Sequence, residues 1–388
     1  MKWSVWNSGP AAAVIGRPLP RKSACKKPIF AGLAAAAGVL AFGAAPAALA
    51  AQTPAQAPAG DLEVLHVKGN VYAIFGAGGN VVVSVGQDGV FVVDTGLAQN
   101  ADRVIAAIRK LQAEVQARED LPPPTCCAET RGSLQLSMNP HGPPKPIRFI
   151  VNTHAHPDHV GGNDALRAAG QTFTGGNVAA TIGDAASGAM LLAHENVLTR
   201  LSDPPPNQPK QPEGGLPSST YFGDSMKFSH FFNGEAIQLF HPKTAHTDGD
   251  TYVYFRGSDV LVAGDLFVMT TYPLIDTARG GTIDGVIDAA NSMLDIAVPE
   301  YRLEGGTLIV PGHGRVGDIA DLAYYRDMLT IIRDRVREMK GKGMSLAQVK
   351  AARPTRDYDP RFGATSGFWT TDQFVGAVYN TLPAGRRR

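Results

Sequence analysis

The 388-residue sequence has few cysteines, and this shortage limits the kinds of site it can build. Cys25 lies near the N-terminus, while Cys126 and Cys127 are adjacent in a proline-rich stretch with no histidine nearby. We therefore do not expect a cysteine metal site. In an oxidising compartment the adjacent pair could bond between chains, and an exposed loop position is the simpler interpretation.

The sequence also lacks an apolar run suited to a permanent membrane span. The run from Ile29 to about Leu49 is rich in alanine and is interrupted by Gly43 and Pro46. It follows a basic stretch and ends in the small-x-small site 48–50, an order typical of a secretory signal peptide. We predict a signal peptide over 1–50, a flexible spacer over 51–61, and a periplasmic or secreted protein with no stable membrane anchor.

A strong charge of either sign is missing as well. Residues 1–50 hold six basic and no acidic residues, so the remaining chain has 30 basic and 35 acidic residues and a formal charge of −5. Proteins that bind nucleic acid through its phosphates usually carry a basic patch. We expect no nucleic-acid partner. The composition, 44% hydrophobic and 18% charged, is that of an ordinary globular protein.

Short β-branched runs and amphipathic segments follow one another in two similar halves. Strands are predicted at 64–67, 71–75, 81–85, 90–93, 147–151, 226–232, 235–241, 252–255, 260–262 and 308–310, and helices at 101–117, 164–169, 186–201, 283–296, 319–339 and 371–382. This order predicts an α/β fold, a four-layer αββα sandwich. We expect a catalytic domain over 62–340 and a helical extension over 341–388 packed on it. The loops 119–146 and 203–225 are expected to form the pocket rim.

Three histidines and an aspartate lie within six residues, directly after the apolar strand 147–151. They are His154, His156, Asp158 and His159. Side chains two apart in extended chain point the same way, so His154 and His156 can converge. The other two follow one turn later, and such a loop can serve two metal sites.

Three further candidate ligands lie at or beside the ends of strand-like runs: His246, Asp265 and His313. Imidazole nitrogen and carboxylate oxygen suit zinc, and no thiolate is available here. Seven protein ligands shared by two metal ions leave room for a bridging hydroxide. The sequence therefore predicts two Zn²⁺ per chain.

The order HxHxDH, His, Gly-Asp and Pro-Gly-His resembles that of the metallo-β-lactamase superfamily, over nearly all of residues 62–315. The resemblance implies a first metal on His154, His156 and His246, and a second on Asp158, His159 and His313. It implies that Asp265 bridges both, that Asp158 is also the catalytic proton acceptor, and that Asp94 supports the metal loop from outside. Such outer hydrogen bonds fix the tautomer of a ligating histidine.

The sequence departs from the zinc β-lactamases of that superfamily. They usually lack an acidic bridging residue where Asp265 stands, whereas hydroxyacylglutathione hydrolases, lactonases and phosphodiesterases have one. The segments 193–197 and 325–328 are similar to those of a large group of secreted bacterial members with poorly defined substrates. The expected activity is a binuclear zinc-dependent hydrolysis of an ester, thioester, lactone or lactam bond in a small molecule, with β-lactams among the candidates.

Several other polar residues have simpler interpretations. Tyr272 could line the pocket and contact the substrate, although buried packing is the commoner role. Asp248 and Asp250 are expected to be turn residues that bind local backbone. The remaining histidines are expected to be structural or exposed: His66, His141, His194, His230 and His241.

Three alternative functions remain open. One is an iron-dependent oxidoreductase of the same fold, although the two-iron members resemble an H-x-E-x-D pattern and this chain has His156 in place of the glutamate. Another is a phosphodiester or nucleic-acid processor, against which the negative charge counts. The third is a non-catalytic binding protein, which would be expected to lose ligands.

Overall fold

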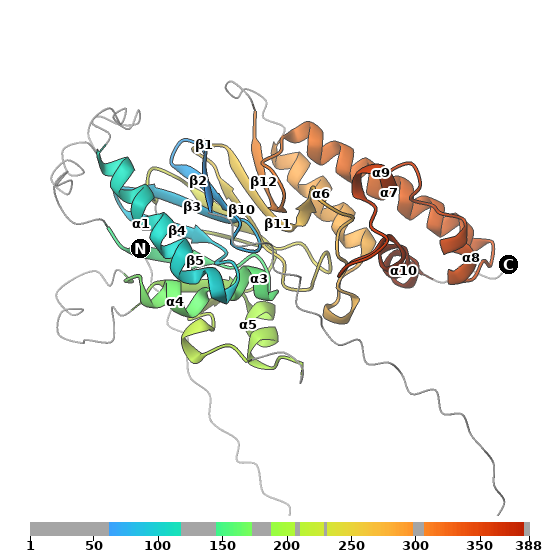
Figure 1. The fold of residues 1–388 in the computed structure, drawn as a ribbon, viewed down its shortest axis with the longest axis horizontal. Helices are drawn as coiled ribbons and strands as arrows, with labels where there is room; N and C mark the ends of the chain where they lie inside the picture. Colours follow the sequence, from blue (N-terminus) through green and yellow to red (C-terminus); the bar gives the residue numbers. More distant parts are fainter. Residues whose placement is uncertain are drawn as a thin grey trace, which may run out of the picture. The chain divides into compact units, whose positions relative to one another are not determined.

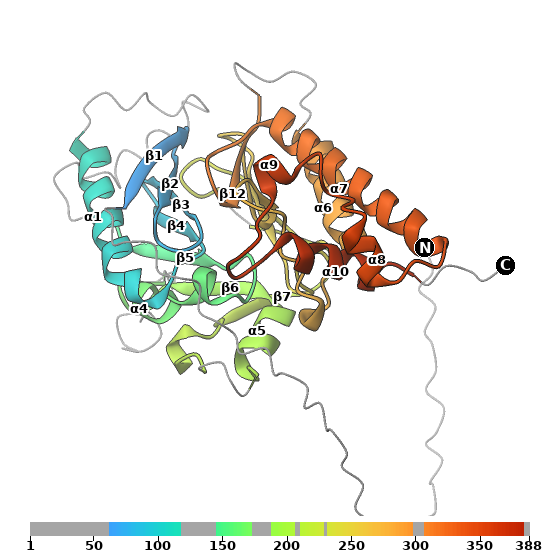
Figure 2. The ribbon, with the colours of Figure 1, turned by 45° about the vertical axis from the view of Figure 1, so that its right-hand side comes forward.

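Two β-sheets face each other at the centre of the computed structural model (Figures 1 and 2). The structure describes residues 62–117, 145–172, 188–205, 210–228, 231–297 and 306–383, which all belong to one unit, residues 50–388. The predicted leader and spacer, the three cysteines, His141 and His230 lie outside the described residues. None of the helices in the described ranges combines the length and apolar character needed to cross a membrane.

The first sheet has seven strands, in the spatial order β1 to β7. These are β1 (Glu63–Lys68), β2 (Val71–Phe75), β3 (Val81–Gly86), β4 (Gly89–Val93), β5 (Ile147–Val151), β6 (Met190–His194) and β7 (Ser219–Tyr221). Strands β1 to β4 are antiparallel and joined by tight turns, whereas β4 to β7 are parallel. Parallel neighbours need crossover connections, and helix α1 (Ala101–Ala117) lies in the first of them.

The second sheet has five strands, in the order β12-β11-β10-β9-β8. These are β8 (Ser225–Lys227), β9 (Ile237–Phe240), β10 (Tyr252–Phe255), β11 (Val260–Val268) and β12 (Leu308–His313). Only the pair β11 and β12 is parallel among these neighbours, and α6 (Ile283–Ala297) lies between them in sequence. Both sheets are therefore mixed.

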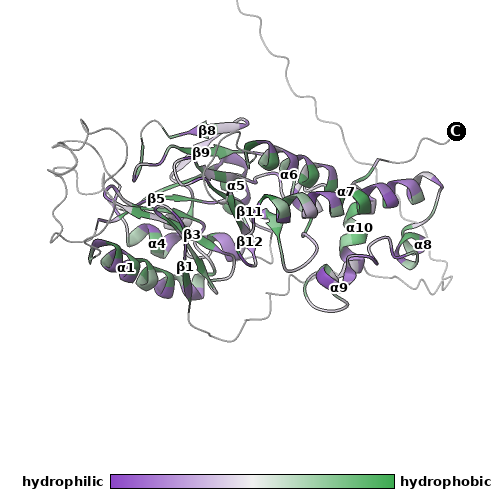
Figure 3. Cartoon of the chain, turned by 90° about the horizontal axis from the view of Figure 1, so that it is seen from above, coloured by the Kyte–Doolittle hydropathy of each residue, from purple (hydrophilic) through white to green (hydrophobic). Residues whose placement is uncertain are grey.

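Three apolar clusters divide the fold into layers. One cluster lies between the sheets and joins residues such as Phe91 and Val151 to Leu239 and Val262. A second packs α1 on the outer face of the first sheet, and a third packs α6 and α7 (Ile319–Gly341) on the second sheet. Figure 3 shows the strands largely in the hydrophobic colour and α1 and α7 in mixed colours, as expected for helices that bury one face. The layers are those of the predicted αββα sandwich.

The C-terminal segment packs on the same cluster as α6 and α7. It contains α8 (Leu346–Ala351), α9 (Asp359–Phe362) and α10 (Thr371–Thr381), which place Val349, Phe362 and Phe374 in that cluster. The Lys340 ammonium donates hydrogen bonds to the carbonyls of Tyr379 and Leu382. The extension is thus bound to the second half of the sandwich.

Some predicted elements are wrong. The predicted helix over 186–201 is strand β6 followed by α5 (Glu195–Ser202). The predicted strand over 226–232 is limited to β8 among the described residues, and the rim loop 203–225 contains the unpredicted strand β7. A short apolar run such as Met190–His194 does not reveal by periodicity whether it is helix or strand. Its place between β5 and β7 decides the matter.

Candidate metal centre

All seven predicted ligands meet between the two sheets in two adjoining groups. His154, His156, His246 and Asp265 form the first group, and Asp158, His159 and His313 form the second. In each group the ligand atoms lie within 4.8 Å of one another. The seven side chains are contributed by both halves of the chain, so the centre exists only when the two sheets pack together.

The loop after β5 contributes four of the seven. His156 is the residue before α3 (Pro157–Val160), and proline at the first position of that helix suits its fixed φ. The helical turn places Asp158 and His159 in the second group, while His154 and His156 belong to the first. One short loop therefore serves both groups.

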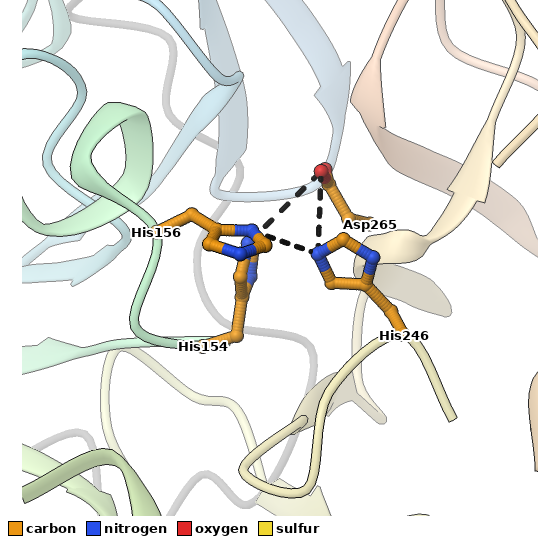
Figure 4. A group of neighbouring side chains, drawn as sticks. All are labelled: His154, His156, His246 and Asp265. Carbon is orange, nitrogen blue, oxygen red and sulfur yellow. Dashed lines mark hydrogen bonds and ion pairs between the residues drawn. The ribbon is translucent and has the colours of Figure 1, made fainter. Parts of the chain in front are cut away.

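Asp265, in strand β11, belongs to the first group, and Figure 4 shows its carboxylate directed towards the imidazoles of that group. Its Oδ2 is 4.0 Å from Nε2 of His154 and 3.7 Å from Nε2 of His246. Its Oδ1 is 3.3 Å from Nε2 of His159 and 3.5 Å from Nε2 of His313. Each carboxylate oxygen thus faces one group, which is the geometry of a bridging ligand. Ligands of a tetrahedral zinc lie roughly 3.3 Å apart, given zinc–nitrogen bonds of about 2.0–2.1 Å.

Outer hydrogen bonds fix the proton on two of the three first-group imidazoles. Nε2 of His156 lies 3.0 Å from the Asp276 carboxylate and must donate to it. Nδ1 of His246 lies 2.6 Å from the Leu274 carbonyl and must donate likewise. The unprotonated Nδ1 of His156 and Nε2 of His246 are then left facing each other at 2.9 Å.

Asp94, in the loop after β4, fixes the proton position on His159 directly and on His154 through Thr153. Oδ2 of Asp94 accepts from Nδ1 of His159 at 2.7 Å and from the Thr153 hydroxyl at 2.7 Å. The Thr153 hydroxyl donates its only proton to Asp94. Nδ1 of His154, 3.0 Å from that hydroxyl oxygen, must therefore donate to it. Asp94 has a φ of 60°, a left-handed conformation that aspartate tolerates better than most residues. The predicted supporting role of Asp94 matches these contacts.

A cation fits this arrangement. The four inward-facing imidazole nitrogens carry lone pairs, and the carboxylates of Asp158 and Asp265 add only acceptors. Nε2 of His154, Nε2 of His159 and Oδ1 of Asp265 are buried and have no hydrogen-bond partner among the described residues. Buried acceptors that face one another without a donor are costly, and a metal ion removes that cost.

Burial and neighbouring charges shift the pKa values of the ligand side chains. Burial, followed by the charges of neighbouring histidines, lowers the pKa of His246 to about 4 and that of His154 well below its usual value. For Asp158, burial acts to raise the pKa, but the charge of His159 and the hydrogen bond from His313 lower it to about 2. Neutral imidazoles and ionised carboxylates are the forms that bind metal. In the second group burial acts to lower the pKa of His159 and His313, but the charges of Asp265 and Asp158 raise it, so a metal ion bound there would replace protons.

A glycine loop between β2 and β3 supports the second group from behind. The Gly79 amide donates to the carbonyl of Asp158 at 3.0 Å, and the Asn80 amide donates to that of Gly312, beside His313. A Cβ at Gly79 would overlap the His159 ring, 2.5 Å from its Nε2. Only glycine lets the loop approach the ligand this closely.

A family model agrees with this site. The model described as the metallo-beta-lactamase superfamily matches residues 74–313, well over half of the chain. The chain belongs to the metallo-β-lactamase superfamily. The predicted family and fold class are confirmed, and the two His/Asp groups are typical of binuclear sites in this superfamily.

Two proteins that are similar to this chain in sequence carry the names of different enzymes. A metallo-beta-lactamase type 2 from Bacillus sp. (strain 170) is 24% identical over 185 residues, or 48% of this chain and 58% of the relative. A 2,4-dinitroanisole O-demethylase subunit alpha from Nocardioides sp. (strain JS1661) is 28% identical over 145 residues, or 36% of this chain and 35% of the relative. Each match thus spans under two thirds of the relative's length.

Among solved structures, the stereoselective inverting sec-alkylsulfatase Pisa1 from Pseudomonas sp. aligns with a TM-score of 0.53 at 16% identity. The alignment covers 82% of this chain and 50% of that one. At this level of identity the likeness supports the superfamily fold.

Sequence reasoning missed the partners of two first-group ligands. Asp276 is 120 positions from His156 and lies in the irregular segment between β11 and α6, where no periodic pattern marks it. The carbonyl of Leu274 carries no side-chain signal at all. Asp276 also accepts from the Arg279 guanidinium at 2.6 Å. Burial raises its pKa, but these two partners outweigh burial and hold the pKa well below its usual value.

The structure decides between the two roles considered for Tyr272, and the role expected of Asp248 is wrong. Tyr272 is buried, its ring stacks on Phe374, and its hydroxyl donates to the Thr355 carbonyl and to Asp359. The structure therefore favours the packing role over the substrate contact. Asp248 forms an ion pair with Arg200 instead of binding local backbone.

Asp250 accepts from the amide and hydroxyl of Thr247, as expected of a turn residue. Its carboxyl is buried, and burial raises its pKa to about 8.

His194 and His241 form a buried stacked pair outside the metal groups. Their ring centroids are 3.6 Å apart, Nδ1 of His241 bonds the Asp250 carbonyl, and His194 caps α5. Burial, followed by the charge of His241, lowers the pKa of His194 to about 4. The expectation that both are structural agrees with these contacts.

This pair predicts an acid sensitivity of the fold. The His194 pKa is lower folded than unfolded, so its contribution to stability is complete above about pH 6.5 and is lost as the pH falls towards 4. We expect His194→Asn, which replaces the capping Nδ1 by a side-chain oxygen, to reduce the stability loss between pH 7.5 and pH 5 by about 1–2 kcal/mol. Urea unfolding at both pH values measures this. An unchanged difference between the two pH values would contradict it.

Proposed function

We propose that this superfamily member is a binuclear zinc hydrolase that opens an ester, thioester, lactone or lactam bond of a small molecule. The observation that carries the proposal is Asp265, whose two oxygens face the two ligand groups. A site for a single metal ion would need only one of the two ligand groups. A protein that only binds a small molecule would need neither group of buried metal-binding atoms. The complete set of seven ligands supports a catalytic centre.

The chemistry expected from two bound zinc ions is a lowered pKa of a shared water and a polarised substrate carbonyl. The chain's own residues prepare that chemistry. Asp276, Leu274 and Asp94 hold the imidazoles in one tautomer, so their lone pairs point inward before any ligand arrives. Little reorganisation is then required during the reaction.

The substrate is expected to approach on the side of the second group. The side chains of His313 and Asp158 are 32% and 21% exposed, whereas those of His154, His159 and His246 are almost fully buried. Asp158 is ionised at neutral pH because its pKa is about 2. It is the residue placed to accept a proton at its carboxylate as the scissile bond is attacked.

Substrate, partners and location are also proposed. The formal charge of −5 after the predicted leader supports a small-molecule substrate over nucleic acid. The leader pattern supports export to the periplasm or beyond. A β-lactam belongs among the substrates to test, since a metallo-beta-lactamase type 2 is one of the similar proteins.

Purified protein tests the proposal. We expect about two zinc ions per chain by elemental analysis and turnover of at least one member of a panel of β-lactams, lactones, thioesters and phosphodiesters. His156→Ala should abolish that turnover, because it removes a ligand of the first group together with the imidazole that donates to Asp276. His66→Ala is the matched control, since His66 is exposed and its described contacts, a hydrogen bond with the Gly69 carbonyl and a ring contact with Tyr72, lie outside both ligand groups.

Two results would contradict this proposal. Full turnover by His156→Ala would show that the reaction does not need the first group. Native protein that contains iron and consumes oxygen would support the oxidoreductase alternative instead.

A further inference from the structure

The segment Thr270–Arg279 joins the C-terminal extension to the first metal group. On its inner side, the Leu274 carbonyl accepts from His246 at 2.6 Å, and the Asp276 carboxylate bonds His156 at 3.0 Å. The Asp276 amide also donates to the carbonyl of His246 at 2.9 Å. Two of the first group's imidazoles therefore depend on where this segment lies.

The outer side of the same segment is held by the extension. The Trp369 indole N–H donates to the Pro273 carbonyl at 3.1 Å. The Tyr272 hydroxyl donates to the Thr355 carbonyl at 3.1 Å and to Asp359 at 3.0 Å, and the Tyr272 amide donates to the carbonyl of Phe362. Positions 272 and 273 thus bond outward to the extension, and positions 274 and 276 bond inward to the ligands.

The second group is supported from elsewhere. His159 is held by Asp94, after β4. The carbonyl of Asp158 accepts from the Gly79 amide, that of Gly312 from the Asn80 amide, and that of His313 from the Met269 amide, directly after β11. These contacts come from the first sheet, its loops and the end of β11, and none of them involves residues 341–383.

We propose that Tyr272 and Trp369 are positioning residues for the first metal ion, through which the C-terminal extension sets the placement of Leu274 and Asp276. This inference rests on the proposed two-metal function. It adds that the extension acts selectively on one of the two ions. Removing the outer contacts lets positions 274 and 276 move relative to His246 and His156, and outer partners of metal ligands are typically worth 10–100-fold in metal affinity.

The test compares three variants with the wild type in the full chain. Trp369→Phe removes the N–H and keeps an aromatic ring, and Tyr272→Phe combined with Trp369→Phe removes both anchors. Tyr379→Phe is the matched control, because its hydroxyl bonds the Met344 carbonyl within the extension and not the 270–279 segment. Zinc affinity is measured by chelator competition. His246→Ala and His313→Ala proteins assign each binding step to a group.

We expect Trp369→Phe to weaken the first-group zinc about 3- to 10-fold and the double variant about 10- to 100-fold, with second-group affinity changed less than about twofold. The visible spectrum of the Co²⁺-loaded protein should change in the first-group bands alone. Tyr379→Phe should match the wild type in affinity and spectrum even if its melting temperature falls.

Equal affinities in all proteins would overturn the inference, and so would equal weakening of both groups, which indicates general loosening of the fold. A wild type that binds fewer than two zinc ions would contradict the proposed function and this inference together. A wild type with two zinc ions and unaffected variants would contradict the inference alone.

Discussion

Asp265→Asn should abolish binding of both metal ions and lower hydrolysis by at least about a thousandfold, more than the loss of an outer partner causes. The amide has the size of the carboxylate but no charge, and one of the two acceptor oxygens is replaced by an NH₂ donor. Either orientation of the amide sets an N–H beside one group, where the bridging geometry requires an acceptor.

Thermal unfolding with and without zinc provides a second readout for this variant. Wild-type protein should gain about 2.7 kcal/mol per site at zinc concentrations a hundredfold above the dissociation constant of that site, and Asp265→Asn should gain almost nothing. Asp224→Asn makes the same chemical change at an exposed ion pair with Lys243 and should behave as wild type. Normal zinc content in Asp265→Asn would show that the carboxylate does not bridge.

Gly79→Ala should remove the second metal ion and leave the first, with hydrolysis reduced about 100-fold. The new methyl group would occupy the space of the His159 ring. The ring cannot retreat without breaking its hydrogen bond to Asp94. Elemental analysis should therefore give about one zinc ion per chain. This selectivity is opposite to that expected of Trp369→Phe.

Gly341→Ala is the matched control for the glycine substitution. A Cβ there has no atom within 4 Å, and the residue is the last of α7. We expect unchanged zinc content and equal or slightly higher stability, because alanine is the better helix former. If Gly79→Ala retains two zinc ions and full activity, the close packing of the glycine loop on His159 has no functional consequence.

The four ligands at 154–159 were predictable from a strong local signal, and the other three from their strand context and the order of the motifs. His154 to His159 come directly after the apolar strand β5, and His313 ends the buried strand β12. Strands with β-branched residues, such as Val71–Phe75 and Tyr252–Phe255, were predicted with the bounds that the structure has. Local pattern and tertiary structure agree at these places.

The supporting contacts were less predictable because they depend on tertiary packing. Asp94 was found by resemblance, whereas Asp276 lies in an irregular segment that is hydrogen-bonded to the extension. Strand β6 contains Met, Leu and Ala, which favour helices, and pairing with β5 and β7 overrides that preference. Asp248 pairs with Arg200, 48 positions away, which no turn pattern could indicate.

The central claim is that Asp265 joins two cations held by the two ligand groups. Crystals of the zinc-loaded wild type, measured on both sides of the zinc absorption edge, test it most directly. We expect two anomalous peaks about 3.5–4 Å apart. One should lie among His154, His156 and His246 and the other among Asp158, His159 and His313. Each should be bound to one oxygen of Asp265. A single peak, or two peaks of which either lacks the Asp265 carboxylate, would contradict it.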